Sequence, residues 1–382
     1  MKRLRCSIIR GGTSKGIFFL ENDLPKDQKK KEKTILDIFG SPDVRQIDGL
    51  GGADILTSKG AIIGVSSRPD ADVDYTFAQV MIDRAEIAWG INCGNISAAV
   101  GGFAVDESLV KAVEPVTKVR IYNTNTDKII IASVPVINGK SNPIGDYRID
   151  GVPGTGAKIS LDFSQTIGSS TGKLLPTGSA RDILNVEGLG KVTVSIVDIA
   201  NLYLFTSAKD IGLDGTETVE DIIQNKEALE KAEMIRSAAA LKLGLVKNVK
   251  EASTVSPIRP LSVFVLPSME YLSHADGSTI KSNDIDLKAF ITAMGQVHKA
   301  YAGTGAVCTG VAAKLKDSVV NEILSDTGQK SSNIRIGHPS GIMDIDVRLS
   351  EKDDTISVEE ASFFRTARRI MDGYVYLKDD RS

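Results

Sequence analysis

The segment Asn92–Gly102 (NCGNISAAVGG) constrains the fold more than any other part of the sequence. After its first residues it consists of small and apolar side chains without a polar face, so a helix here has to be enclosed on all sides. Asn92 and Asn95 could cap its start, and Gly94 would let a ligand approach the backbone. A helix N-terminus carries unpaired N–H groups and a partial positive charge, which favour a bound carboxylate and a reactive thiol at Cys93. The alternative is a buried cysteine that acts only as a small hydrophobic side chain.

The composition of the chain limits the classes of function to consider. Its 382 residues are 42% hydrophobic and 25% charged, as in an ordinary globular protein of two or three domains. A net charge of −3 gives no reason to expect nucleic acid or a membrane surface as partner, and no apolar run reaches the roughly 18 residues that span a bilayer. The three cysteines are widely spaced and odd in number, which argues against a disulfide framework and favours the cytoplasm. We also expect a homo-oligomer.

The sequence lacks the common signatures of metal and cofactor sites. Its three histidines are not at helical ligand spacing, and there is no Cys-x-x-Cys pair. Neither a phosphate-binding P-loop nor a dinucleotide fingerprint occurs. We therefore expect no metal and no cofactor, with the chemistry performed by side chains.

Two polar segments in the first half could serve an anionic substrate. Strands predicted at 5–9 and 16–20 are joined by a glycine turn that presents Thr13, Ser14 and Lys15, although a simple hairpin turn would look the same. Further on, Ser58 and Lys59 enter an apolar strand. Burying an ammonium is costly unless it is paired or loses its proton, so such a lysine is a candidate base. The alternative is a lysine that extends from the strand end into solvent.

A similar order of features recurs in the second half. A strand, a polar turn and a strand occur around Ser14 and again around Asn201, and Ser58-Lys59 is matched by 256–259. A glycine-rich helix with a cysteine, Cys308, is predicted within 299–313. This pattern predicts two similar domains, 1–180 and 181–382, that face each other across a cleft. Further helices are predicted at 25–40, 217–243 and 286–295, and a strand at 147–149.

Four short motifs together resemble the PrpF family. They are the GGTSKG, TSK, NCGN and IGHPSG sequences at 11–16, 57–59, 92–95 and 336–341, and the similarity continues to 365–376. The family is similar in fold to diaminopimelate epimerase. The resemblance therefore implies an α+β protein of two pseudo-symmetric domains, each a mostly antiparallel β-sheet or barrel around a central helix, with the active site in the interdomain cleft. The last strand could return to the N-terminal domain.

The resemblance also implies an activity. The family includes methylaconitate isomerases, 3-methylitaconate Δ-isomerases and oxalomesaconate tautomerases, and the chain looks most similar to the 3-methylitaconate enzymes. These catalyse a cofactor-independent 1,3-proton shift in a small unsaturated di- or tricarboxylate, here 3-methylitaconate to 2,3-dimethylmaleate. The matching catalytic positions are Lys59 and Cys93, with Ser14 lining the site. A racemase or epimerase with opposed bases, or an accessory protein that binds a carboxylate without converting it, are the alternatives.

Other residues are expected to contact the substrate. Cys308 is the possible counterpart of the second epimerase cysteine, but 302–305 resembles the epimerase Cys-Gly-Thr-Gly with alanine in place of cysteine, which speaks against a two-thiol mechanism. For His338 a ligand contact and a structural role are both open. Arg365, Arg368 and Arg369 are expected on a solvated or interface face. The predicted substrate contacts are Thr13, Lys15, Ser58, Asn92, Gly94, Asn95, Gly303, Thr304, Gly305, Cys308 and His338.

Overall fold

The computed structural model describes residues 2–90, 92–293, 296–353 and 355–378, and the chain divides into two compact units. The first unit is Met1–Asp162 together with Phe364–Ser382, and the second is Phe163–Phe363. The sequence predicted a boundary at 180/181 instead. The segment that follows Asp162 stays with the second unit because its polar groups bond there: the Asp198 carboxylate accepts hydrogen bonds from Ser169 Oγ and from the N–H of Thr171, at 2.7 and 2.6 Å.

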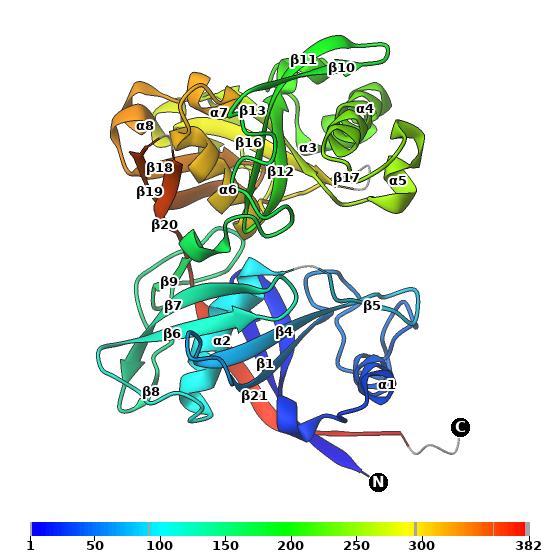
Figure 1. Ribbon diagram of the computed structural model, residues 1–382. Coiled ribbons are helices and arrows are strands. Elements are labelled where there is room, and N and C mark those ends of the chain that lie inside the picture. The colour runs from blue at the N-terminus through cyan, green and yellow to red at the C-terminus, as the bar shows by residue number, and fades with distance from the viewer. Residues whose placement is uncertain (1, 91, 294–295, 354, 379–382) are drawn as a thin grey trace. The chain divides into compact units, whose positions relative to one another are not determined.

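The first unit is a sheet with one helix on each face (Figure 1). Its elements in chain order are β1 (Arg3–Gly11), β2 (Ser14–Leu20), α1 (Gln28–Phe39), β3 (Lys59–Val65), β4 (Val73–Val80), β5 (Ile87–Ala88), α2 (Gly94–Asp106), β6 (Val116–Asn123), β7 (Lys128–Ile137), β8 (Lys140–Ser141), β9 (Ile159–Asp162) and, from the C-terminal end, β21 (Ala367–Tyr376).

The second unit has more helices around a similar sheet. Its elements are β10 (Asp182–Val186), β11 (Gly190–Ile199), β12 (Asn201–Ser207), α3 (Val219–Gln224), α4 (Lys226–Lys242), α5 (Ala252–Val255), β13 (Leu261–Pro267), β14 (Tyr271–Leu272), β15 (Thr279–Ile280), β16 (Leu287–Ala293), β17 (Gln296–Val297), α6 (Gly303–Lys314), α7 (Val319–Glu322), α8 (Asp326–Lys330), β18 (Asn333–His338), β19 (Gly341–Lys352) and β20 (Thr355–Arg365), the last of which runs on into the first unit.

Both units are built from the same order of strand pairings. In the first, β1–β2 is antiparallel, β2–β3 parallel, β3–β4 antiparallel, β4–β6 parallel and β6–β7 antiparallel. In the second, the same series links β11, β12, β13, β16, β18 and β19. A parallel step requires a crossover, and α1 and α2 provide the two crossovers in the first unit, as α4 and α6 do in the second. The predicted α+β class with two pseudo-symmetric domains is confirmed.

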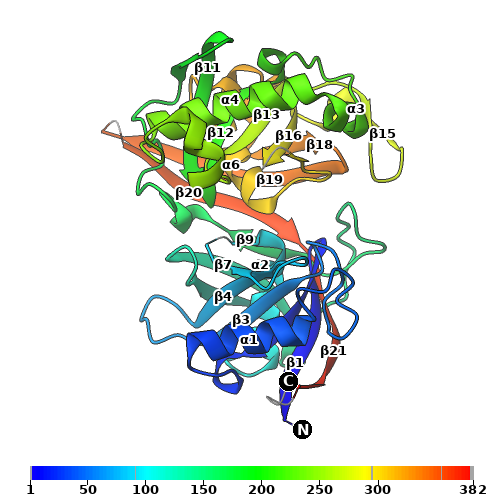
Figure 2. The same ribbon diagram turned by 90° about the vertical axis from the view of Figure 1, so that its right-hand side faces the viewer.

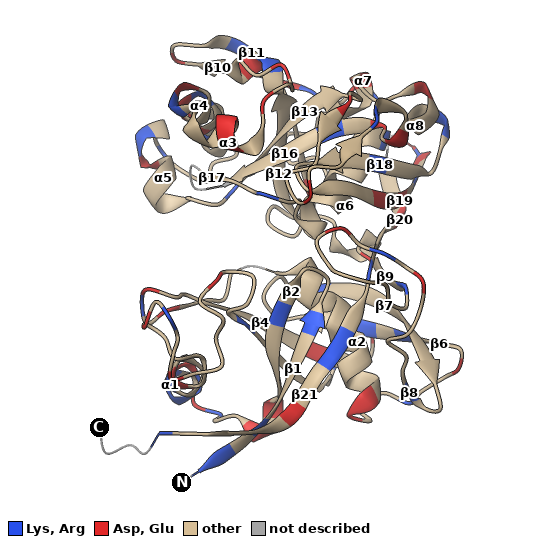
Figure 3. Ribbon diagram, turned by 180° about the vertical axis from the view of Figure 1, so that it is seen from behind, with Lys and Arg blue, Asp and Glu red and all other residues tan. Residues whose placement is uncertain are grey.

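Helices α2 and α6 are enclosed by their sheets, as the sequence of α2 requires. Almost all their residues are buried, and each carries one charged residue, Asp106 or Lys314, at its last position (Figure 3). Gly101 permits close packing, because a Cβ there would lie 2.7 Å from Val134 of β7. Helices α1 and α4 instead cover the other face of each sheet and keep a polar surface (Figure 2). No helix among the described residues is long and apolar enough to span a membrane.

Two sequence predictions for the second unit and one for the first are wrong. The segment predicted as a helix at 286–295 contains strand β16, whose β-branched and aromatic residues pair with β13. The helix predicted at 217–243 is two helices, because Asn225 ends α3 and caps α4. The strand predicted at 147–149 is only an isolated bridge between Tyr147 and Gly156.

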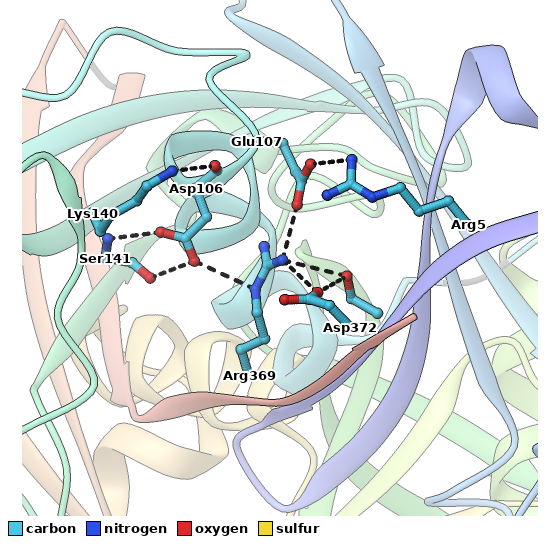
Figure 4. A network of polar contacts seen from close by, with 8 residues as sticks. Arg5, Asp106, Glu107, Lys140, Ser141, Arg369 and Asp372 are labelled. Atoms are coloured by element: carbon cyan, nitrogen blue, oxygen red, sulfur yellow. Dashed lines mark hydrogen bonds and ion pairs between the residues drawn. The ribbon is translucent and has the colours of Figure 1, made fainter. Parts of the chain in front are cut away.

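A network of charged side chains holds the C-terminal end of α2 (Figure 4). Arg369 on β21 donates to Glu107 at 2.8 Å and to Asp372 at 2.7 Å, and its Nε lies 3.5 Å from Asp106. Arg5 on β1 pairs with Glu107 at 2.8 Å. Cations are favourable at this end of a helix. Arg369 thus lies in a partly buried network and fixes α2 against β1 and β21, whereas the sequence predicted a solvated or interface face for it.

Candidate active site

Three polar side chains on neighbouring strands face the start of α2. Side chains of a strand alternate between the two faces of its sheet. Ile62 of β3 and Ala78 of β4 pack in a hydrophobic cluster with residues of α1. The residues that alternate with them along each strand therefore point to the other face, toward α2. Lys59 and Gln79 belong to that second set and are directly opposite each other in the β3–β4 pairing. Ser14 shares its face of β2 with Gly16 and Phe18, both of which lie against α2.

Lys59 is buried and held by a neutral partner. Its side chain, 6% exposed, donates a hydrogen bond from Nζ to Gln79 Oε1 at 2.7 Å, and Nζ lies 5.4 Å from the centre of the Phe77 ring. Within the described part of the chain, no carboxylate pairs with this ammonium. The sequence left a buried and a solvent-directed lysine both open, and the structure shows the buried one. The chemical role of Lys59 is a matter of proposal.

The Ser14 hydroxyl is buried without a partner. The residue is 2% exposed, and among the described residues Oγ has no hydrogen-bond acceptor or donor. A buried unsatisfied hydroxyl costs free energy, about 1–3 kcal/mol, so it is a group to which a ligand atom could bind with gain. Ser14 stands out in this respect from its neighbour Thr13, whose Oγ1 accepts a hydrogen bond from Asn95 at 3.0 Å.

The start of α2 is an uncapped helix N-terminus with a thiol. Cys93 is the N-cap residue, half-buried, and its side chain caps no backbone N–H in the described structure. By contrast, side chains cap α1 (Asp27), α3 (Thr218) and α4 (Asn225). The first N–H groups of α2, beginning at Gly94, can therefore bind an anion.

The glycine turn between β1 and β2 lies directly on this helix end. A Cβ at Gly12, whose φ is +52°, would be 2.1 Å from Asn95 Oδ1, and one at Gly11 would be 2.3 Å from the Asn95 carbonyl oxygen. Only glycine permits such an approach. The turn thereby brings Thr13 and Ser14 to the first turn of α2. Lys15 is half-buried and is bound through its backbone N–H, which donates to the Leu56 carbonyl at 2.9 Å.

Arg365 also lies at this helix end, whereas the sequence predicted a solvated or interface face for it. It is 5% exposed, its Nε donates to Asn95 Oδ1 at 3.0 Å, and its Nη1 donates to the Phe364 carbonyl at 2.8 Å. Burial lowers the pKa of the Arg365 guanidinium to about 10, against the opposing attraction of Tyr147, Asp150 and Cys93. The group remains a cation at neutral pH. Arg368, as predicted, is exposed.

Two of the predicted contact residues are engaged in structural hydrogen bonds. Asn92 Oδ1 accepts from Ser97 Oγ and from Asn123 Nδ2, both at 3.2 Å. Ser58 is fully buried, and its Oγ donates to Gln46 Oε1 at 2.7 Å. Gln46 also accepts from the Ala53 N–H at 2.8 Å, so it organises the loop that leads into Lys59.

In the second unit, α6 begins at a position equivalent to the start of α2, but with different side chains. Thr304 Oγ1 is hydrogen-bonded to Asn201 Nδ2 and to the Tyr203 hydroxyl, at 3.1 and 3.0 Å. Gly303 and Gly305 allow close packing, because a Cβ on either would lie 2.7 Å from Phe363 or Ile291. These three residues form the first turn of α6, and their contact with the substrate stays a prediction.

Comparing the two pairings position by position shows what the second unit lacks. Gly16, the third residue of β2, lies opposite Lys59 in the β2–β3 pairing. Tyr203, the third residue of β12, lies opposite Leu261 in the β12–β13 pairing. Lys59 and Leu261 are therefore at matching positions. The N-cap residue of α6 is Ala302, where α2 has Cys93. At these matched positions, therefore, only the first unit has a lysine and a half-buried thiol, and the second has Leu261 and Ala302.

Cys308 does not match Cys93, which corrects the predicted correspondence. It lies inside α6, is 0% exposed, and its Sγ contacts the Val197 carbonyl at 3.4 Å. Burial raises the pKa of the Cys308 thiol well above its ordinary value. The sequence left two alignments open, and the helix starts support the one that places Ala302 opposite Cys93.

His338 is buried in the β18–β19 turn. Its ring stacks on Tyr301 with centroids 5.9 Å apart, and Nδ1 accepts from the Ser340 N–H at 3.2 Å. Its contact with the substrate stays a prediction. Among the described residues, no group of three or more His, Cys, Asp or Glu side chains could hold a metal ion.

Sequence reasoning missed Gln79 and misplaced Arg365, and both had a weak signal. Val73, Tyr75, Phe77 and Gln79 alternate along one face of β4, and Gln79 is the polar member of that otherwise apolar set. Arg365 directly follows Phe363 and Phe364 within the same strand. A polar residue that interrupts a buried pattern needs a partner.

Comparisons with known proteins show which family the chain resembles. A family model described as PrpF protein matches residues 1–378. The chain is 53% identical over 376 residues to 3-methylitaconate isomerase of Eubacterium barkeri, covering 98% of this chain and 97% of that protein. It is 37% identical to 2-methyl-aconitate isomerase of Shewanella oneidensis (98% and 96% covered) and 38% identical to 4-oxalomesaconate tautomerase of Pseudomonas putida (99% and 97% covered).

Solved structures show the same fold. A crystal structure of methylitaconate-delta-isomerase, 52% identical, superposes with a TM-score of 0.89 over 98% of this chain and 96% of that one. A hydroxyproline epimerase from Agrobacterium vitis, 13% identical, reaches 0.51 over 99% and 94%. The second likeness concerns the fold alone.

The three thiols should differ in reactivity. The thiolate is the reacting form, and burial raises the pKa of Cys6 and of Cys308, while Cys93 is half-buried at a helix start. We expect iodoacetamide to alkylate Cys93 of the native protein about tenfold faster than the other two, or more. Peptide mass spectrometry over time measures this, with urea-unfolded protein as the control in which all three react. Equal labelling of native Cys308 would contradict its placement.

Proposed function

The chain belongs to the PrpF family and is an isomerase, and we propose that it converts 3-methylitaconate to 2,3-dimethylmaleate by a 1,3-proton shift without a cofactor. The substrate is taken from the relative of 53% identity. The observation that chiefly supports the reaction is the convergence of three groups in the first unit: the buried Lys59, the unpartnered Ser14 hydroxyl and the uncapped start of α2.

The reaction is difficult because it increases the negative charge of the substrate. The proton to be removed is on the allylic carbon beside a carboxylate, and its loss adds negative charge to a substrate that is already a dianion. Preorganised donors can stabilise that charge, because they need no rearrangement when it develops. The start of α2 supplies backbone N–H groups and the positive end of the helix dipole, and Ser14 supplies a hydroxyl.

Lys59, as an amine, takes the proton from the allylic carbon of 3-methylitaconate. The electron pair of that C–H bond forms the internal C=C bond, the old C=C bond opens, and a proton is added to the former methylene carbon to give a methyl group. Atoms and charge balance, since one proton leaves and one arrives. Cys93 either delivers the second proton or shapes the pocket, and Lys59 could itself return the proton that it removed.

Two kinds of donor hold the carboxylates in this proposal. One carboxylate binds the N–H groups at Gly94 and Asn95 and the Ser14 hydroxyl. The Arg365 guanidinium provides a buried cation beside Asn95, suited to the second carboxylate. All these groups belong to the first unit.

The compartment and the assembly remain predictions. Cys6, Cys93 and Cys308 are free thiols, which supports the expected cytoplasmic setting, where thiols stay reduced. The expected homo-oligomer can be checked by measuring the mass of the protein in solution.

An ultraviolet assay tests the reaction. Moving the double bond from the exocyclic methylene to the internal position changes the absorbance, so we expect a progressive change with 3-methylitaconate. Related substrates, 2-methylaconitate and 4-oxalomesaconate, carry an additional carboxylate and should give a kcat/KM lower by about tenfold or more. A higher value for one of them would assign the chain to that reaction instead. A flat trace with all three, despite measurable binding, would favour an accessory protein.

Arg365 should contribute to substrate binding. We expect Arg365→Gln to raise KM for 3-methylitaconate by about tenfold or more, because a hydrogen bond to a charged group contributes about 1.5–3 kcal/mol. Steady-state kinetics measures this. Arg368→Gln, an exposed arginine on the following strand, is the matched control and should leave KM unchanged. An unchanged KM in Arg365→Gln would remove this residue from the site.

A further inference from the structure

Gln79 fixes the position of the Lys59 ammonium. The two residues face each other across the β3–β4 pairing, and Lys59 Nζ donates to Gln79 Oε1 at 2.7 Å. Both side chains are buried, and Gln79 is 4% exposed. A lysine side chain has several rotatable bonds, so this hydrogen bond selects one direction for Nζ.

The orientation of the Gln79 amide is itself determined by its neighbours. Its Nε2 donates to the Ser58 carbonyl at 3.1 Å and to the Ile55 carbonyl at 3.3 Å. Carbonyl oxygens only accept, so the nitrogen must face them and the oxygen must face Lys59. The amide cannot flip without losing these hydrogen bonds.

The partner of Lys59 is neutral, and so are its surroundings. The titratable groups on elements packed against β3 lie elsewhere: Glu21 and Asp74 are both next to Gly64, near the far end of the strand, and the Lys15 side chain belongs to the opposite face of β2 from Ser14. Asp23 lies in the same short turn as Glu21, and Asp106 is at the last position of α2, far from its start. Cys93 at the start of α2 and the Tyr75 hydroxyl on β4 are the remaining titratable groups on these elements. Tyr75 is deeply buried, which raises the pKa of its hydroxyl and keeps it protonated.

We propose that Gln79 is a positioning residue that holds Lys59 through a neutral acceptor, so that the lysine can both release and take up the catalytic proton. A carboxylate in its place would form a buried ion pair and keep the ammonium protonated. An apolar residue would leave Lys59 Nζ without a hydrogen-bond acceptor that fixes its position. The inference rests on the proposed role of Lys59 as base. It adds that Gln79 determines the protonation and the orientation of the Lys59 side chain.

The isosteric substitution Gln79→Glu tests this through the pH profile. The carboxylate stabilises the ammonium, so we expect kcat at pH 7 to fall by about tenfold or more. The acidic limb of the kcat profile should move upward by about one to three pH units, with activity recovering at higher pH. KM should change little, because Gln79 does not bind the substrate.

A second substitution separates this role from a structural one. Gln79→Met has a similar volume but no acceptor, so the ammonium loses its hydrogen bond and the acidic limb should move to lower pH, opposite to the glutamate variant, with a reduced kcat. Gln224→Glu, an exposed glutamine at the end of α3, is the matched control for the added charge and should leave the profile unchanged. Thermal unfolding verifies that each variant folds.

A measurement without turnover distinguishes the failure of this inference from the failure of the proposed function. Carbon-13 NMR of labelled lysine, with the Lys59 signal assigned by Lys59→Arg, follows the protonation of this residue in the folded protein. We expect its titration to move upward in Gln79→Glu whether or not any substrate is converted. An unchanged titration, or an identical pH profile in Gln79→Glu and the wild type, would overturn the role of Gln79 even if the isomerase is active.

Discussion

A buried helix start without a capping side chain is the constraint on which the site depends. Helix α2 has no polar face and is enclosed by its sheet, so its first N–H groups cannot all be satisfied by water as they are in a surface helix. The surface helices α1 and α4 use Asp27 and Asn225 for this purpose, whereas the enclosed helix α6 has no capping side chain either. Leaving α2 uncapped costs stability, and an anionic substrate can recover that free energy on binding. The glycine turn at Gly12 and the arginine Arg365 are both arranged around this helix end.

The two units have the same fold but differ in the side chains at matching positions. Their strand pairings follow the same order, and each encloses an uncapped central helix. The side chains at matching positions differ, however: Lys59 corresponds to Leu261, and Cys93 to Ala302. The backbone thus provides two helix starts suited to anions, while Lys59 and Cys93, to which we assign the proton transfer, belong to the first unit. This asymmetry fits a lysine-based proton shift better than a pair of opposed thiols.

The sequence predicted the features that depend on composition along one segment. The enclosed helix at Gly94–Asp106 followed from its small apolar residues. The place of Lys59 at the start of an apolar strand marked it as a candidate, but the sequence left its burial open. Features that depend on tertiary pairing were harder. The short apolar run that contains β16 fits a helix or a strand equally well, and only its pairing with β13 decides between them. Gln79 sits in an alternating strand in which either face could be the solvated one, and helices cover both faces. Cys308 was matched to Cys93 by residue type, whereas the fold matches the helix starts.

The account depends most on Lys59 as the group that moves the proton. The direct measurement is proton NMR of the isomerisation of 3-methylitaconate in D₂O, carried out with the wild type and with Lys59→Ala at equal concentration. Exchange of the lysine proton with solvent should place deuterium in the newly formed methyl group of 2,3-dimethylmaleate, and the variant should form product slower by about 100-fold or more. Product formation by Lys59→Ala at the wild-type rate, with Cys93 intact, would contradict the account.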